Sequence, residues 1–167
     1  KAVITPKTKI LLLNTPSNPT GSVYTKEELT ALGKVLEGTD IIVLSDEMYE
    51  KIIYNGKKFT AAAEVSEDMF KRTVTINGLS KAVAMTGWRF GYLASPDVKL
   101  VKALTKLQGQ VTSNINTMTQ YAAIPALNGD ADADIEMMIA ALKKKKNIVV
   151  KSFNEIIPFN LLCPSII

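Results

Sequence analysis

Short runs of consecutive apolar residues are the first regular feature of the chain. Four such runs, each bounded by polar or turn-forming residues, predict strands at residues 9–13, 40–45, 72–76 and 90–94. Unbroken apolar strands, unlike strands in which polar residues alternate, are typical of a sheet that is covered on both faces. Together with the helices described next, they predict an α/β fold with a mostly parallel sheet and flanking helices.

Apolar residues repeat with helical spacing in four other segments. Residues 26–37 form the clearest helix, because Thr25 and Glu28 make a capping box at its start and Gly38 follows its end. Further helices are predicted at residues 97–110, 116–127 and 135–156, and the last of them is long. The order strand, helix, strand over residues 9–45 predicts a βαβ unit.

Polar residues gather where the first three predicted strands end. These clusters are residues 14–18, 46–49 and 77–81, and each directly follows an apolar run. In a parallel sheet, ligands bind beyond the carboxyl ends of the strands. The three clusters are therefore expected to meet at one edge of the sheet and to form a binding site there.

The chain has 167 residues with no histidine and a single cysteine, Cys163. The lack of histidine excludes Ser-His-Asp and Cys-His nucleophilic schemes and most zinc sites, so no metal site is predicted. Proton transfer must then be carried by Lys, Tyr, Asp or Glu. One cysteine cannot form an internal disulfide, which fits a reducing compartment and favours a cytoplasmic location. No secretory signal and no apolar run of membrane-spanning length is visible, so no membrane partner is expected.

The net charge of +4 raises the question of a nucleic-acid partner. Basic residues are spread along the chain apart from the lysine run 143–146, which lies in a predicted helix and is interpreted as a solvated face. Because aromatic and basic residues do not interleave, no nucleic-acid partner is expected. Only Arg72 and Arg89 accompany eighteen lysines, which suggests that arginine is kept for tasks that need its planar fork.

The side chains near the strand ends fit a cofactor that binds a lysine through an imine. Such a cofactor needs a lysine amine, a carboxylate for a pyridinium nitrogen, donors for a phenolate oxygen, and hydroxyl and arginine groups for a phosphate. The chain offers this set in Asn18, Asp46, Tyr49, Ser80, Lys81 and Arg89. Each residue alone has an ordinary structural explanation, such as a turn, a cap or a surface position. Their joint occurrence at one predicted edge favours the cofactor site.

Three motifs in this order and spacing resemble the cofactor motifs of class-I/II aminotransferases, which have fold type I and depend on pyridoxal 5'-phosphate (PLP). They are NTPSNPTG at residues 14–21, SDEMYE at residues 45–50 and NGLSKAVAMTGWRFGY at residues 77–92. The MTGWR sequence within the third resembles the bacterial and archaeal aspartate or aromatic aminotransferases. The resemblance implies an enzyme that moves an amino group between an amino acid and a 2-oxo acid.

The resemblance also implies roles for individual residues. Lys81 would form the Schiff base with PLP and then move the proton between the substrate and the cofactor. Asp46 would pair with the pyridinium nitrogen, while Asn18 and Tyr49 would hydrogen-bond the phenolate oxygen. Lys81, Tyr49 and Asp46 are thus the expected catalytic residues.

The phosphate of PLP would be held by Ser80 and Arg89. Gly78 occupies a position where some family members carry a hydroxyl residue, so one phosphate contact is missing from this set. The resemblance further implies a homodimer, with residues 110–114 near the subunit interface. In the family sheet we expect strand 90–94 to run antiparallel beside strand 72–76, followed by strand 9–13 and then strand 40–45.

The chain is expected to be a central fragment, because family members are more than twice as long. Residues 1–130 would form a partial PLP-binding large domain, and residues 131–167 the connecting helix and the beginning of the small domain. No arginine is left to bind a substrate carboxylate, so little activity is expected from the chain alone. A PLP-dependent lyase of the same fold and a non-catalytic remnant remain as alternatives.

Overall fold

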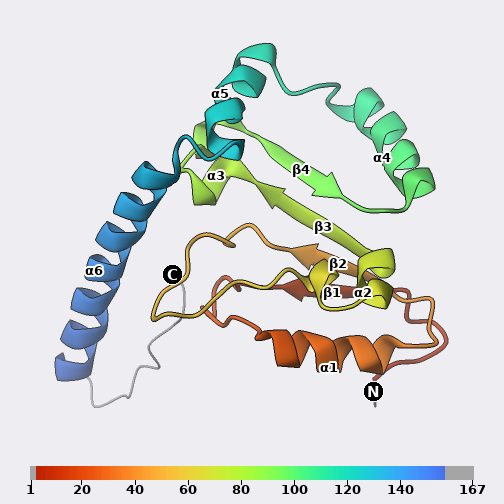
Figure 1. Ribbon diagram of the computed structural model, residues 1–167, viewed down its shortest axis with the longest axis horizontal. Helices are drawn as coiled ribbons and strands as arrows, with labels where there is room; N and C mark the ends of the chain where they lie inside the picture. Colours follow the sequence, from red (N-terminus) through yellow and green to blue (C-terminus); the bar gives the residue numbers. More distant parts are fainter. Residues whose placement is uncertain (1–2, 157–167) are drawn as a thin grey trace.

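The computed structural model describes residues 3–156, and a four-stranded sheet runs through its centre (Figure 1). The strands lie in the order β1-β2-β3-β4 and comprise β1 (Ile10–Asn14), β2 (Ile42–Asp46), β3 (Thr73–Gly78) and β4 (Gly91–Ala94). The first three strands are parallel, and β4 runs antiparallel to β3. The predicted α/β fold is confirmed, as is the antiparallel pairing of the fourth strand.

The predicted order of the strands is wrong. The prediction placed strand 9–13 between strands 72–76 and 40–45, whereas β2 lies between β1 and β3. Leu44 of β2 pairs with Leu12 on one side and with Val74 on the other. Two physical reasons favour the observed order. Strands that are consecutive in the chain usually lie side by side, and the fully buried Val43 suits an inner strand.

The first helix, α1 (Lys26–Leu36), agrees with the prediction to within one residue. Its capping box is formed, since the Thr25 side chain accepts from the Glu28 amide at 3.2 Å and Glu28 accepts from the Thr25 amide at 2.8 Å. Gly38 follows with a φ of +72°, a left-handed conformation that favours glycine. Local signals therefore define both ends of this helix.

Three further helices were predicted and are observed: α4 (Val98–Val111), α5 (Thr117–Leu127) and α6 (Asp132–Ile156). Four short elements were not predicted, namely η1 (Ala62–Glu64), α2 (Glu67–Arg72), α3 (Leu79–Ala82) and η2 (Thr86–Trp88). Residues 157–167, which the sequence analysis assigns to the beginning of the small domain, lie outside the described residues. The division into domains at residue 130 stays a prediction. Within residues 3–156, no helix is long and apolar enough to cross a membrane.

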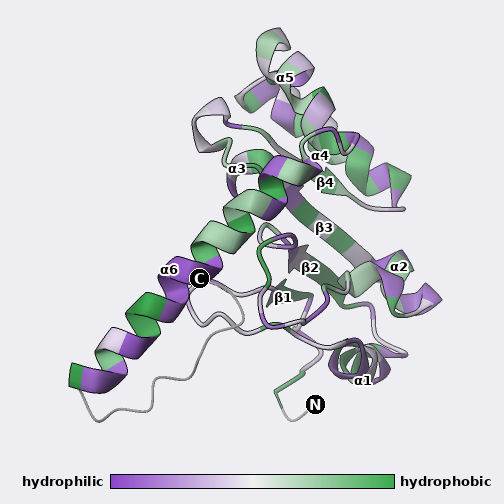
Figure 2. Ribbon diagram, turned by 60° about the vertical axis from the view of Figure 1, so that its left-hand side comes forward, coloured by the Kyte–Doolittle hydropathy of each residue, from purple (hydrophilic) through white to green (hydrophobic). Residues whose placement is uncertain are grey.

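The main core lies between α1, α2 and one face of the sheet. Leu29 and Leu36 of α1 pack there with Val43 of β2 and Met69 of α2, and all four are buried. The opposite face is open at β1, where the side chain of Leu12 is 69% exposed. Coverage of both faces, which the apolar runs predict, is thus not found at this strand. Figure 2 shows hydrophobic residues along the strands.

Candidate functional site

The carboxyl ends of the three parallel strands lie in register. Asn14 at the end of β1 pairs with Asp46 at the end of β2, and Asp46 pairs with Ile76 of β3. The antiparallel β4 begins at Gly91, opposite Gly78. The loops that follow β1, β2 and β3 and the loop that precedes β4 therefore leave the sheet at one edge. All six candidate residues belong to these loops or to the strand ends.

Asn18 and Tyr49 are joined directly, although they lie on different loops. The Asn18 side-chain amide donates to the Tyr49 hydroxyl at 2.9 Å. Asn14 orients this loop, because its side-chain oxygen accepts from the Asn18 backbone amide at 3.0 Å. The sequence motif contained Asn14 without assigning it a role, and its position directly after an apolar strand was the available signal.

Asp46 is the last residue of β2 and is partly buried. Its carboxylate accepts from the Met48 backbone amide at 3.2 Å. Its backbone carbonyl accepts from the Thr15 amide at 3.1 Å and from the Asn14 side chain at 3.4 Å. These bonds attach the end of β2 to the loop after β1 and so fix the backbone position from which the Asp46 carboxylate extends.

Lys81 lies on α3, a single turn that follows β3 directly. The start of this turn is fixed by a close approach of two backbones. A Cβ atom on Gly78 would lie 2.6 Å from the carbonyl oxygen of Phe90, and the Leu79 amide donates to that same oxygen at 3.2 Å. Glycine is needed here because a side chain would not fit. Its backbone conformation is not the reason, since the φ of Gly78 is 178°, an extended conformation that any residue can adopt. The Lys81 side chain is partly buried.

Ser80 and Arg89 are connected through Thr86. The Thr86 hydroxyl donates to the Ser80 carbonyl at 2.8 Å, and the Arg89 guanidinium donates to the Thr86 carbonyl at 3.1 Å. Arg89 has a φ of +56°, which is uncommon for a residue with a side chain and is found most often at functional sites and turns. Thr86 was missed as a site residue, although it stands in the MTGWR sequence.

Two carboxyl groups that follow Asp46 were also missed. Glu47 is 2% exposed and accepts from the Ser45 hydroxyl at 2.8 Å and from the Ala62 amide at 3.0 Å. Burial raises the pKa of Glu47, and these two hydrogen bonds partly oppose the rise. Burial also raises the pKa of Glu50, which is partly offset by a hydrogen bond from the Asn77 side chain. No short sequence pattern distinguishes a carboxyl group that becomes buried beside a strand end from one that stays exposed.

The six candidate residues share one edge of the sheet. A large open cleft of about 1780 Å³ lies between β4, α4 and α5, and Arg89 is among the residues that line it. Within residues 3–156, the Lys81 ammonium forms no salt bridge. The described residues also contain no cluster of three or more potential metal ligands.

The chemistry of this edge fits PLP. Asn18 and Tyr49 lie side by side and offer donors to one ligand oxygen, since the Tyr49 hydroxyl accepts from Asn18 and keeps its own proton to donate. Asp46 offers a carboxylate that matches a pyridinium nitrogen, and Lys81 offers a primary amine. Each of these side chains thus has the hydrogen-bonding or charge properties that match the PLP group it would contact.

Comparison with known proteins agrees with the motifs. The family model described as "Aminotransferase class I and II" matches residues 1–166. An aspartate aminotransferase from Geobacillus stearothermophilus is 44% identical over 164 residues, which is 98% of this chain and 41% of that protein.

Two solved structures are also similar. The aromatic aminotransferase from Pyrococcus horikoshii OT3 superposes with a TM-score of 0.92 at 35% identity, over 99% of this chain and 44% of that one. The aspartate aminotransferase from Rhizobium meliloti gives 0.93 at 37% identity, over 99% and 41%. The chain thus spans less than half the length of the proteins that it matches. On the family match and the shared fold, the chain belongs to the class I and II aminotransferases.

Proposed function

We propose that this chain is the cofactor-binding part of a PLP-dependent aminotransferase of the aspartate or aromatic type. The whole protein would move an amino group from an amino acid to a 2-oxo acid. The observation that carries the proposal is the hydrogen bond between Asn18 and Tyr49, at the same sheet edge as Asp46 and Lys81. Relatives named aspartate aminotransferase and aspartate/prephenate aminotransferase support this substrate class.

Lys81 is the proposed covalent anchor and proton carrier. Its amine would bind the aldehyde of PLP and, once displaced by the substrate, would take the proton from the substrate α-carbon. When bound, PLP supplies an electron sink that makes this proton acidic. Asp46 would keep the pyridinium nitrogen protonated by pairing with it. Asn18 and Tyr49 would orient the ring through its phenolate oxygen.

Ser80 and Arg89 are the proposed phosphate ligands. A guanidinium has five N–H donors, and the Arg89 group donates one bond to the Thr86 carbonyl. The remaining donors suit the fork geometry that phosphate binding needs. Thr86 would act through Arg89 and Ser80, whose positions it links.

The chain alone is expected to have little or no transaminase activity. A substrate carboxylate is best fixed by a bidentate arginine, a geometry that lysine lacks. Arg72 donates to Asp68 at 2.8 Å and to the carbonyls of Thr39 and Ile41 at 2.9 Å, next to the beginning of β2 and far from Asp46. Arg89 is assigned to the phosphate, so neither arginine is left for the substrate.

We also infer that the chain associates with itself. Apolar side chains are exposed along the edge strand β1 and on α4, where Leu107 and Val111 are examples. Exposed strand edges and apolar faces recruit other chains. Light scattering that finds a monomer at every concentration would contradict this. A cytoplasmic location is proposed as well, on the strength of the single cysteine.

A single-turnover experiment tests the proposed function. The chain is loaded with PLP, excess aspartate or phenylalanine is added, and the appearance of the 2-oxo acid is followed. We expect slow formation of oxo acid that disappears in Lys81→Ala and persists in the control Lys144→Ala, an exposed lysine of α6. Oxo acid formation that survives in Lys81→Ala would contradict the assignment. Conversion at about 1–1000 per second would contradict the expected low activity.

A further inference from the structure

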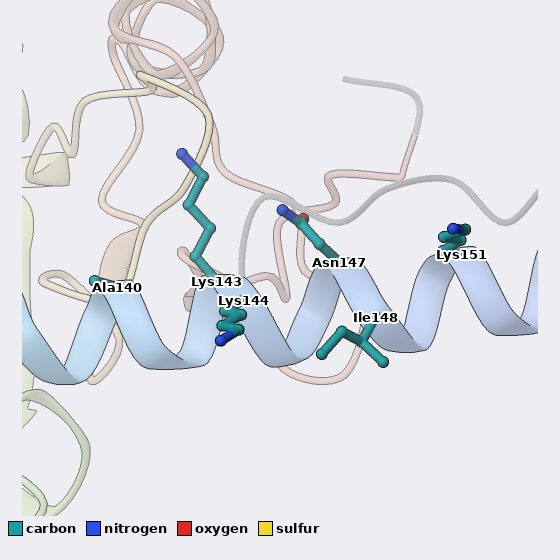
Figure 3. A pocket seen from close by; sticks show the side chains of 6 residues that line it. All are labelled: Ala140, Lys143, Lys144, Asn147, Ile148 and Lys151. Atoms are coloured by element: carbon teal, nitrogen blue, oxygen red, sulfur yellow. The ribbon is translucent and has the colours of Figure 1, made fainter.

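One member of the lysine run on α6 is not solvated. Lys143, Lys144 and Lys145 are exposed, as the sequence predicts, but the Lys146 side chain is 0% exposed. Figure 2 shows the hydrophilic stretch midway along α6. In Figure 3, Lys143 and Asn147 lie on one side of the helix, while Lys144 and Ile148 lie on the other. The interpretation of the whole run as a solvated face is therefore wrong at Lys146.

The Lys146 ammonium rests on an aromatic ring. Its nitrogen lies 4.9 Å from the centre of the Tyr54 ring, and Tyr54 is itself buried. Within residues 3–156, neither this nitrogen nor the Tyr54 hydroxyl has a hydrogen-bond partner. An unpaired buried ammonium is costly, and its attraction to a ring face grows as water is removed. The ring contact therefore offsets part of the cost of burying this charge.

A second contact fastens the same two segments. The Lys51 ammonium forms a salt bridge with Asp132 at 3.0 Å, where α6 begins. Both partners are more than one-third exposed, so this pair adds little stability by itself. Figure 1 shows the segment after β2 reaching toward α6. Lys51 and Tyr54 attach that segment to α6 at two points, one exposed and one buried.

Tyr49 belongs to this fastened segment. The Ile52 amide donates to the Tyr49 carbonyl at 2.9 Å, which closes a tight turn over residues 49–52, two residues before Tyr54. Asn18 holds the Tyr49 hydroxyl from the side of β1. The segment is therefore held by α6 at one end and by the loop after β1 at the other.

We propose that Lys146 is a positioning residue for Tyr49. Its ammonium, docked on the Tyr54 ring, holds the segment 49–54 against α6 and so keeps the Tyr49 hydroxyl beside Asn18. An influence of Lys146 on PLP binding rests on the proposed function, in which Tyr49 contacts PLP. The holding of the segment 49–54 against α6 does not depend on that function.

Hydrogen exchange of the Ile52 amide in the full 167-residue chain tests the contact. Tyr54→Phe keeps the ring face and should leave this exchange unchanged. Tyr54→Leu removes the face and should speed it by about 2- to 30-fold, the range expected for a cation–π contact. The Leu29 amide, which donates to the Thr25 carbonyl in α1, reports any global opening and should not change.

A double-mutant cycle separates the cation–π contact from packing. In a Lys146→Met background, Tyr54→Leu should speed Ile52 exchange much less than it does in the parent chain. An equal effect in both backgrounds, or no effect in either, would overturn the proposal. If Tyr54→Leu does not fold, Lys146→Met decides alone: it must speed Ile52 exchange without changing Leu29, whereas Lys144→Met must change neither.

The affinity for PLP tests the link to Tyr49. Tyr54→Leu should weaken PLP binding several-fold in the parent chain and have no further effect in Tyr49→Phe. A loss of the same size in both backgrounds would overturn the assigned route through Tyr49. If the parent chain binds no PLP, the proposed function fails, and Ile52 exchange still decides whether Lys146 holds the segment.

Discussion

The side-chain amide of Asn18 donates to the hydroxyl of Tyr49 at 2.9 Å, and so joins two loops that follow different strands. Because the hydroxyl accepts this bond, its own proton remains available for a ligand oxygen. The hydrogen bond therefore positions the donor groups of Asn18 and Tyr49 side by side without the help of a ligand. It also makes the contribution of each donor measurable by small substitutions.

Replacing Tyr49 by Phe should weaken PLP binding by about 2- to 12-fold, the equivalent of one hydrogen bond of about 0.5–1.5 kcal/mol. The fold should be little affected, since Asn18 is exposed and can bond to water instead. Absorbance titration with PLP measures the affinity. Tyr24→Phe, at an exposed position, is the matched control and should bind like the parent chain. Equal affinities for all three proteins would remove Tyr49 from the site.

Replacing Gly78 by Ala should destabilise the chain by about 1–3 kcal/mol, because the added methyl group overlaps backbone that cannot move easily. The new Cβ would lie 2.6 Å from the Phe90 carbonyl oxygen. Urea unfolding measures the loss. Gly87→Ala is the control, since a Cβ there meets nothing within 4 Å. Similar stabilities for the two variants would mean that β3 and the segment before β4 are not in close contact.

Glu47 should make stability depend on pH. Burial raises its pKa in the folded chain above the ordinary value of 4.5. As pH rises from that value, the unfolded chain loses this proton first, so the free energy of unfolding falls until the folded carboxyl also ionises. Glu47→Gln keeps an oxygen acceptor and does not titrate, so its stability relative to the parent should grow with pH. A difference that stays constant with pH, measured by urea unfolding, would contradict this.

Removing the side chain of Glu47 altogether should have a different effect. Glu47→Ala leaves the buried Ala62 amide and Ser45 hydroxyl without their acceptor. The expected cost is about 1–3 kcal/mol. Glu64→Ala, an exposed carboxylate nearby in η1, should change stability little. An equal loss in both variants would show that the buried acceptor is unimportant.

Local signals allowed much of the fold to be predicted. The capping box at Thr25 and the glycine at position 38 defined α1, because both act through the backbone of the helix ends themselves. Polar residues after apolar strands located the candidate site, since parallel strands end at a common edge. Asp46 illustrates this, as it ends β2 in register with Asn14 and Ile76.

Properties that depend on distant contacts escaped prediction. The position of β2 between β1 and β3 was predicted wrongly because the family resemblance was followed, whereas the rule that consecutive strands usually lie side by side favours the observed order. Lys146 looks like its three exposed neighbours and becomes distinct only where Tyr54 meets α6. Thr86 and Glu47 act through carbonyl and amide groups of other segments, so their partners become visible only in the folded chain.

The central claim is that Lys81, among the eighteen lysines of the chain, binds PLP covalently. The direct measurement is to add PLP in slight excess, reduce with borohydride and map the labelled lysine by mass spectrometry of peptides. The account predicts that the label lies mainly on Lys81, and that Lys81→Ala takes up little label while Asn18→Ala lowers labelling at Lys81. Label spread over the exposed lysines of α6, with Lys81 no more reactive than Lys144, would contradict it.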